Sequence, residues 1–177
     1  MVSLDGYFEG PNREIDWHNV DDEFNDFAIE QLDSAGGLIF GRITYELMAG
    51  YWPTKEATID DPIVASKMNS IPKIVFSKTL AKADWNNTRL VKSDVNNEIK
   101  RLKEEPGKEF YIFGSSGLCV TLIQNKLIDE FRVIVNPVVL GKGKPLFAGL
   151  IGYHKLKLIK TKPFKSGNVL LCYEPEN

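Results

Sequence analysis

Short apolar runs and longer segments with helical spacing alternate along the first two thirds of the chain. The apolar runs end at turn signals and predict buried strands at 37–41, 73–77 and 109–114. The longer segments repeat apolar residues three and four positions apart and predict helices at 21–35, 42–50, 62–70, 94–107 and 115–127. Asp21 is a candidate cap for the first of these helices and Gly36 a candidate stop. This alternation indicates an α/β fold.

The last third of the chain reads differently, because its apolar runs follow one another without helices between them. These runs predict strands at 128–141, 154–164 and 167–175, joined by Gly and Pro turns and therefore antiparallel. A short strand at the beginning of the chain turns at Asp5-Gly6. The sequence contains no repeat, low-complexity tract or linker, so we expect a single domain, 1–177, with a mixed sheet and packed helices.

The composition narrows the class of protein. Of 177 residues 43% are hydrophobic, and the net charge of -2 argues against a nucleic-acid or anionic-membrane surface. No apolar stretch reaches the length of a membrane span, and the first residues do not form a signal peptide. Cys119 and Cys172 are far apart, which favours reduced thiols and a cytoplasmic protein. With His18 and His154 as the only histidines, we expect no metal site.

Two of the predicted strands end in the same way. "LIFG-RIT" and "YIFG-SSG" run apolar, break at glycine and continue through hydroxyl-bearing residues into a helix. Ligands of open α/β sheets bind outside the carboxyl ends of strands, where helix N-termini offer free N–H groups. The alternative is a plain turn with a surface ion pair and a helix cap, since neither stretch matches GxGxxG or the P-loop pattern. If both turns hold ligand, they suit the separated parts of one dinucleotide.

A third strand end favours the ligand interpretation. The run "KIVFSKTL" finishes with Ser77 and Lys78, a hydroxyl and a cation. Arg42 and Lys78 together suit an additional 2′-phosphate, so the sequence favours NADPH over NADH. We also expect Ser115 and Ser116 to lie at a helix start with their N–H groups open to an anion.

Several stretches, in order, resemble the dihydrofolate reductase-like superfamily. They are "VSLDGYFEG", "IDW", "LIFGRITYELMAGYWP", "IPKIVFSKTL", "YIFGSSGLCVTLI" and "LIDEFRVIVNPVVLGKGKPLF". The chain is most similar to the reductase domain of the bifunctional riboflavin-biosynthesis deaminase–reductases and its stand-alone relatives. This resemblance implies a central mixed sheet of about eight strands flanked by helices, with NADPH lying across the strand ends.

The resemblance also implies residue roles. Cofactor-binding roles fall on the residues of the three turns, which are Gly41, Arg42, Thr44, Ser77, Lys78, Gly114, Ser115, Ser116 and Gly117. Acceptor-binding roles fall on Asp5, Trp17 and Asp22, and Asp22 and Asp5 are the candidate catalytic carboxylates. From the residues alone, Asp5 could be a turn-former, Trp17 a core aromatic, and Asp22 a helix-start carboxylate favoured by the dipole.

The activity implied is an NADPH-dependent reduction of a small nitrogen heterocycle, with 5-amino-6-(5-phosphoribosylamino)uracil as the family's substrate. The segment Ser70-Ile71-Pro72-Lys73 lacks the arginine that binds folate in true dihydrofolate reductases, and Gly114-Ser115 replaces the usual double glycine. The deaminase half of the bifunctional enzymes has no counterpart. Alternatives are a dihydrofolate or pterin reductase, or a non-catalytic dinucleotide-binding homo-oligomer. The apolar stretch 131–140 could pair across a homodimer.

Overall fold

The computed structural model describes residues 1–176, which form two compact units. The first unit contains Met1–Phe24 and the chain from Cys119 onward, and the second is Asn25–Leu118. The boundaries between the units fall inside α1 (Asp22–Ser34) and α6 (Ser116–Gln124). Each of these helices therefore has residues in both units.

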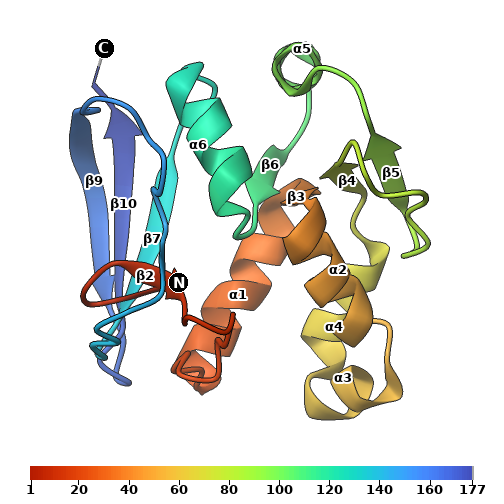
Figure 1. The fold of residues 1–177 in the computed structure, drawn as a ribbon. Coiled ribbons are helices and arrows are strands. Elements are labelled where there is room, and N and C mark those ends of the chain that lie inside the picture. Colours follow the sequence, from red (N-terminus) through yellow and green to blue (C-terminus); the bar gives the residue numbers. More distant parts are fainter. Residues whose placement is uncertain (177) are drawn as a thin grey trace. The chain divides into compact units, whose positions relative to one another are not determined.

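The second unit is built on a parallel sheet of four strands in the order β5-β4-β3-β6 (Figure 1). Its strands are β3 (Ala35–Gly41), β4 (Lys73–Phe76), β5 (Thr88–Val91) and β6 (Glu109–Ile112). Because all four run parallel, their carboxyl ends lie at one edge of the sheet. The pairing of Gly41 with Phe76 and of Ile39 with Ile112 fixes the register there.

Helices connect these strands, and side chains fix where several of them begin. They are α2 (Arg42–Tyr51), α3 (Lys55–Asp60), α4 (Pro62–Ser70) and α5 (Val95–Glu104). The side chains of Thr54, Asp61 and Asp94 accept hydrogen bonds from backbone N–H groups in the first turns of α3, α4 and α5. Pro62 follows its cap at the first position of α4, where the missing N–H has no cost.

The core of the second unit lies between the sheet and these helices. Leu38, Phe40 and Val75 have no exposed surface, which explains why β3 and β4 read as continuous apolar runs. Trp85 joins this core from the loop before β5, packing near the rings of Phe40 and Tyr45. The Tyr45 hydroxyl accepts the Trp85 backbone N–H at 3.0 Å, so the loop is held to α2.

The first unit contains the antiparallel strands. Its four-stranded sheet has the order β1-β7-β10-β9, with β1 parallel to β7 and the other pairs antiparallel. Figure 1 shows β7, β10 and β9 side by side. The strands are β1 (Val2–Ser3), β7 (Phe131–Asn136), β9 (Leu156–Pro163) and β10 (Val169–Pro175). A separate ribbon pairs β2 (Tyr7–Glu9) with β8 (Lys144–Pro145).

The predicted α/β class, the flanking helices and the antiparallel carboxyl-terminal strands are confirmed. The described residues contain ten strands where about eight were expected, distributed over two four-stranded sheets and the ribbon. The additional elements are short or polar: β8 has two residues, and β5 contains Thr88 and Arg89. The strand expected at 128–141 ends early, at Asn136, because Pro137 has no N–H for the ladder.

Candidate active site

The carboxyl edge of the parallel sheet brings together three segments that are distant in sequence. Because β4 and β6 lie on either side of β3, Gly41 at the end of β3 is flanked by the segments that follow these two neighbours. Those segments begin with Ser77 and with Phe113-Gly114. The three predicted turns are therefore adjacent at one edge of the sheet.

Hydrogen bonds join two of these turns directly. The Gly41 N–H donates to Ser115 Oγ at 2.7 Å, and the Ser115 N–H donates to Thr44 Oγ1 at 3.1 Å. Ser116 begins α6, as expected, but the expectation of an open N–H at Ser115 is wrong, because Thr44 accepts it. The backbone N–H groups of Gly41 and Ser115 thus link the two turns at this edge. The Thr44 hydroxyl accepts one of these bonds and still has its own hydrogen to donate.

The glycines at different positions of these turns are explained by different physical features. Gly114 and Ser115 have consecutive left-handed backbones, with φ of 58° and 62°, so the chain turns sharply into α6. A Cβ at Gly41 would lie 3.3 Å from Ser115 Oγ, so it is the neighbouring turn that approaches Gly41 closely. A Cβ at Gly117 would have nothing within 4 Å, and Gly117 is exposed, whereas Ser116 before it is buried.

Two cations lie at this edge. The Arg42 guanidinium pairs with Glu46 one helical turn later, at 2.9 Å, and remains 42% exposed. Lys78 is exposed and makes no ion pair among residues 1–176. The Ser77 hydroxyl accepts the backbone N–H groups of Thr79 and Leu80, which fixes the turn that carries Lys78.

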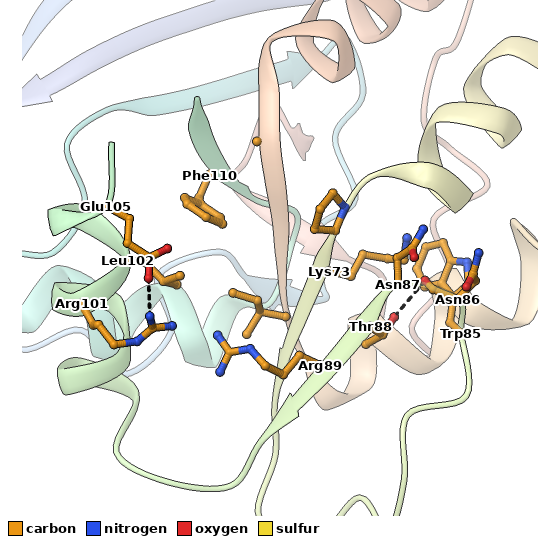
Figure 2. A pocket seen from close by; sticks show the side chains of 13 residues that line it. Lys73, Trp85, Asn86, Asn87, Thr88, Arg89, Arg101, Leu102, Glu105 and Phe110 are labelled. Atoms are coloured by element: carbon orange, nitrogen blue, oxygen red, sulfur yellow. Dashed lines mark hydrogen bonds and ion pairs between the residues drawn. The ribbon is translucent and has the colours of Figure 1, made fainter. Parts of the chain in front are cut away.

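A hollow of about 760 Å³ lies at the opposite, amino-terminal edge of the same sheet (Figure 2). The Arg101 guanidinium in its lining is paired with Glu98 and Glu105, and Arg89 is also paired with Glu98. Glu98 consequently has its pKa lowered to about 2, chiefly by the hydrogen bond from Arg101. Since these charges satisfy one another, the hollow offers little to a ligand, and we place the candidate site at the carboxyl edge.

Lys73 also borders this hollow, and its ammonium is hydrogen-bonded to backbone carbonyls. Its ammonium donates to the carbonyls of Met68 and Ile71, both at 2.7 Å, and more weakly to Asn69. Burial lowers the pKa of Lys73 to about 8. The ammonium lies over the Trp85 ring, 4.5 Å from its centroid. Lys73 therefore caps the end of α4 and cannot replace the missing folate-binding arginine.

In the first unit, Asp5 fastens two loops together. Its carboxylate accepts hydrogen bonds from Ser3 Oγ at 2.6 Å and from the N–H groups of Leu140 and Gly141 at 3.1 and 2.8 Å. The hydrogen bond from Ser3, followed by the backbone bonds, holds the pKa of Asp5 below its usual value. The "SLDG" stretch thus contacts the "NPVVLGKGKPLF" stretch, a partnership that sequence reasoning missed.

Trp17 and Asp22 occupy the segment that leads into α1. Trp17 is half-buried, its indole N–H donates to the Glu14 carbonyl at 3.1 Å, and its ring lies edge-on to His18. Asp22 is the exposed first residue of α1. The carboxylate before it, Asp21, accepts the Phe24 N–H at 2.8 Å, which confirms the predicted cap.

His18 in this segment is half-buried, with its Nε2 shielded from solvent, and this partial burial disfavours its protonation. Burial, and after it the nearby N-terminal charge, lowers the pKa of His18 to about 4. Within residues 1–176, no cluster of three or more His, Cys, Asp or Glu side chains is arranged to hold a metal ion. In that same range, the helices lack the combination of length and apolar character needed to cross a bilayer.

Comparison with known proteins relates this geometry to a family. Residues 1–170 match the family model described as the RibD C-terminal domain, a match that spans both compact units. The uncharacterized protein YyaP of Bacillus subtilis (strain 168) is 36% identical over 174 residues, covering 97% of this chain and 90% of the relative.

Solved structures show the same fold. A protein from Shewanella sp. PV-4, provisionally assigned to riboflavin biosynthesis, superposes with a TM-score of 0.75 at 25% identity, covering 99% of this chain and 96% of that one. A dihydrofolate reductase from Enterococcus faecalis, complexed with NADP(H), superposes with a TM-score of 0.65 at 15% identity and covers 99% and 93%. The dihydrofolate reductase-like fold is confirmed, and the chain belongs to the RibD C-terminal domain family.

Proposed function

We propose that this protein is an NADPH-dependent reductase of a small nitrogen heterocycle. The observation that carries the proposal is the cross-linked pair of turns at the carboxyl edge of the parallel sheet, where Gly41, Thr44 and Ser115 hold one another. Ligands of open α/β sheets bind at such an edge, and the family match supports a reductase of this class. When bound, the reduced nicotinamide would supply the hydride.

The residues at this edge fit a dinucleotide phosphate. Gly117 is exposed in the first turn of α6 and its missing side chain leaves space, so a phosphate could approach the positive end of the helix dipole at this residue. Arg42 would exchange its surface pair with Glu46 for a bidentate contact to phosphate, and Lys78 would add a second cation. Ser77 fixes the Lys78 turn, and the free hydroxyl hydrogen of Thr44 could reach the ligand.

The acceptor would bind beside Trp17 and Asp22, and the two candidate carboxylates would have different tasks. Asp22 is exposed and can orient or protonate the acceptor. Asp5 is held ionised by its hydrogen bonds, so we assign it to orienting the loop at Leu140 and Gly141. The proton that accompanies the hydride would then pass through Asp22 or water.

The proposed acceptor is 5-amino-6-(5-phosphoribosylamino)uracil or a close relative. Support comes from the RibD C-terminal family match and from the hydrogen bonds of Lys73 to backbone carbonyls, because of which residues 70–73 supply no free cation to a folate carboxylate. We further propose that the whole chain works as one domain, because the family match spans both units, and that it is a cytoplasmic homodimer.

The experiment is a comparison of acceptors at fixed NADPH. The purified protein is mixed with NADPH and either 5-amino-6-(5-phosphoribosylamino)uracil or dihydrofolate, and the loss of the NADPH absorbance is followed. Faster oxidation with the ribosylaminopyrimidine supports the proposal. Faster oxidation with dihydrofolate would instead identify a folate or pterin reductase. NADPH binding without oxidation by either compound would identify a non-catalytic binding protein.

A further inference from the structure

The turn between β9 and β10 makes an unusual set of contacts within the first unit. This turn, Phe164–Asn168, closes on itself through the Phe164 N–H bonded to the Asn168 carbonyl at 2.8 Å. Asn168 is fully buried although its side chain is polar. A buried amide normally has a specific partner, because leaving it unpaired is costly.

The amide nitrogen of Asn168 has its partner in the segment that contains Trp17 and Asp22, while its Oδ1 is buried without a hydrogen-bond partner among the described residues. The Asn168 amide donates to the Asn19 carbonyl at 2.6 Å, and the Asn19 amide donates back to the Ser166 carbonyl at 2.8 Å. The Asn19 N–H donates to Oδ1 of Asn136, a second fully buried asparagine at the end of β7. Three hydrogen bonds therefore fix the backbone and side chain of Asn19, two positions after Trp17.

A second anchor holds the start of α1 to the same turn. The Lys165 N–H donates to Glu23 Oε2 at 2.8 Å, and the Phe24 ring packs against Phe164 with centroids 6.4 Å apart. Asp22 lies between these anchors, directly before Glu23 and three residues after Asn19. Its backbone is consequently fixed on both sides while its side chain stays exposed.

We propose that the Phe164–Asn168 turn positions the 17–24 segment for the acceptor, with Asn19, Glu23 and Asn168 as positioning residues. This inference rests on the proposed function, because it takes Trp17 and Asp22 as the acceptor-facing pair. A side chain held by an ordered backbone needs less reorganisation to reach a productive geometry. Loosening the turn should therefore affect the acceptor and not the dinucleotide edge in the other unit.

The test uses variants that remove one anchor each. Asn19→Ala removes only the bond to Ser166, since the two backbone bonds of Asn19 remain, and Glu23→Ala removes the bond from Lys165. The matched control is Asn125→Ala, whose amide also donates to one carbonyl at 2.8 Å, that of Thr121. For each variant we would measure NADPH affinity, KM and kcat for 5-amino-6-(5-phosphoribosylamino)uracil, and hydrogen exchange of residues 17–24.

We expect kcat/KM for the acceptor to fall about two- to tenfold in Asn19→Ala and Glu23→Ala, the worth of one net hydrogen bond. Exchange in 17–24 should rise, while NADPH affinity stays at its original value. Glu23→Gln keeps an oxygen acceptor and should restore the original kinetics.

Acceptor kinetics equal to those of Asn125→Ala would overturn the proposal, as would a parallel loss of NADPH affinity, which would indicate general loosening. If the unsubstituted protein reduces no acceptor, the proposed function fails. Hydrogen exchange alone then decides whether the turn orders the segment.

Discussion

Lys73 shows how a single buried charge is accommodated in this protein. Only 1% of the residue is exposed, and its ammonium replaces water with carbonyls at the end of α4 and with the face of Trp85. A cation in this position also interacts favourably with the negative end of the helix dipole. The group is therefore part of the packing of the second unit.

Lys73→Met should lower the free energy of unfolding by about 1–3 kcal/mol, because it leaves the Met68 and Ile71 carbonyls buried without a donor. The control is Lys78→Met at an exposed position, which should change the free energy of unfolding by less than about 0.5 kcal/mol. Urea denaturation measures both. Equal stability of the two variants would show that the buried hydrogen bonds of Lys73 contribute nothing net.

His18 should make the stability of the protein sensitive to acid. Its pKa is about 4 in the folded state, below the ordinary 6.5, so the unfolded chain binds more protons between these values. The free energy of unfolding should therefore fall as the pH falls from 6.5 toward 4, and it should fall less in His18→Asn. The exposed His154 is the control, and denaturation curves of His154→Asn should follow the original protein across this range.

Asp22→Asn should lower turnover about 100-fold or more if the carboxylate orients or protonates the acceptor. NADPH affinity should hardly change. Asp26→Asn, an exposed acid on the same helix, should leave turnover intact. Unchanged turnover in Asp22→Asn, with a small loss of melting temperature, would mean that Asp22 is only a helix-start carboxylate favoured by the dipole.

Local roles could be predicted from the sequence and distant partnerships could not. Asp21 was identified as a cap because its partner, Phe24, is three residues away. The partners of Asp5, Leu140 and Gly141, are about 135 residues away, and no periodicity indicates them. The same holds for Asn19, whose bond to Asn136 depends on the segment before α1 meeting the end of β7.

Among the elements, the turns after β3 and β6 form one structure. Gly41 and Thr44 belong to the first turn and Ser115 to the second, and each turn supplies both a donor and an acceptor to the other. The sequence predicted both turns from their glycine breaks, because strand ends have strong local signals. It did not predict their mutual bonds, which depend on β3 and β6 being neighbours.

Thr44→Val keeps the shape of the side chain and removes the acceptor for the Ser115 N–H. We expect the free energy of unfolding to fall by about 1 kcal/mol and NADPH affinity to fall about two- to tenfold. The matched control is Thr58→Val, which removes an exposed bond to the Thr54 carbonyl. Calorimetric NADPH titration measures the binding effect, and undiminished affinity would show that the cross-link does not shape the cofactor edge.

At the scale of the whole molecule, the two compact units divide the proposed tasks. The second unit contains every residue assigned to the dinucleotide, and the first contains Trp17 and Asp22, assigned to the acceptor, and Asp5, assigned to the loop at Leu140 and Gly141. The family match extends through both units. The fold class was predictable because strand–helix alternation is a repeated local signal, whereas β5 was missed since "TRLV" has too few apolar residues.

Calorimetric titration of the original protein and of Arg42→Ala with NADPH and with NADH decides whether Arg42 binds a 2′-phosphate. The control is Arg101→Ala, because Arg101 also pairs with a glutamate four residues later and is similarly exposed. We expect tighter binding of NADPH than of NADH. Arg42→Ala should weaken NADPH about tenfold or more and NADH much less, since a charge-assisted phosphate contact is lost. Equal losses for both cofactors would show that Arg42 does not bind a 2′-phosphate, and no binding of either cofactor by the original protein would rule out a dinucleotide site at this edge.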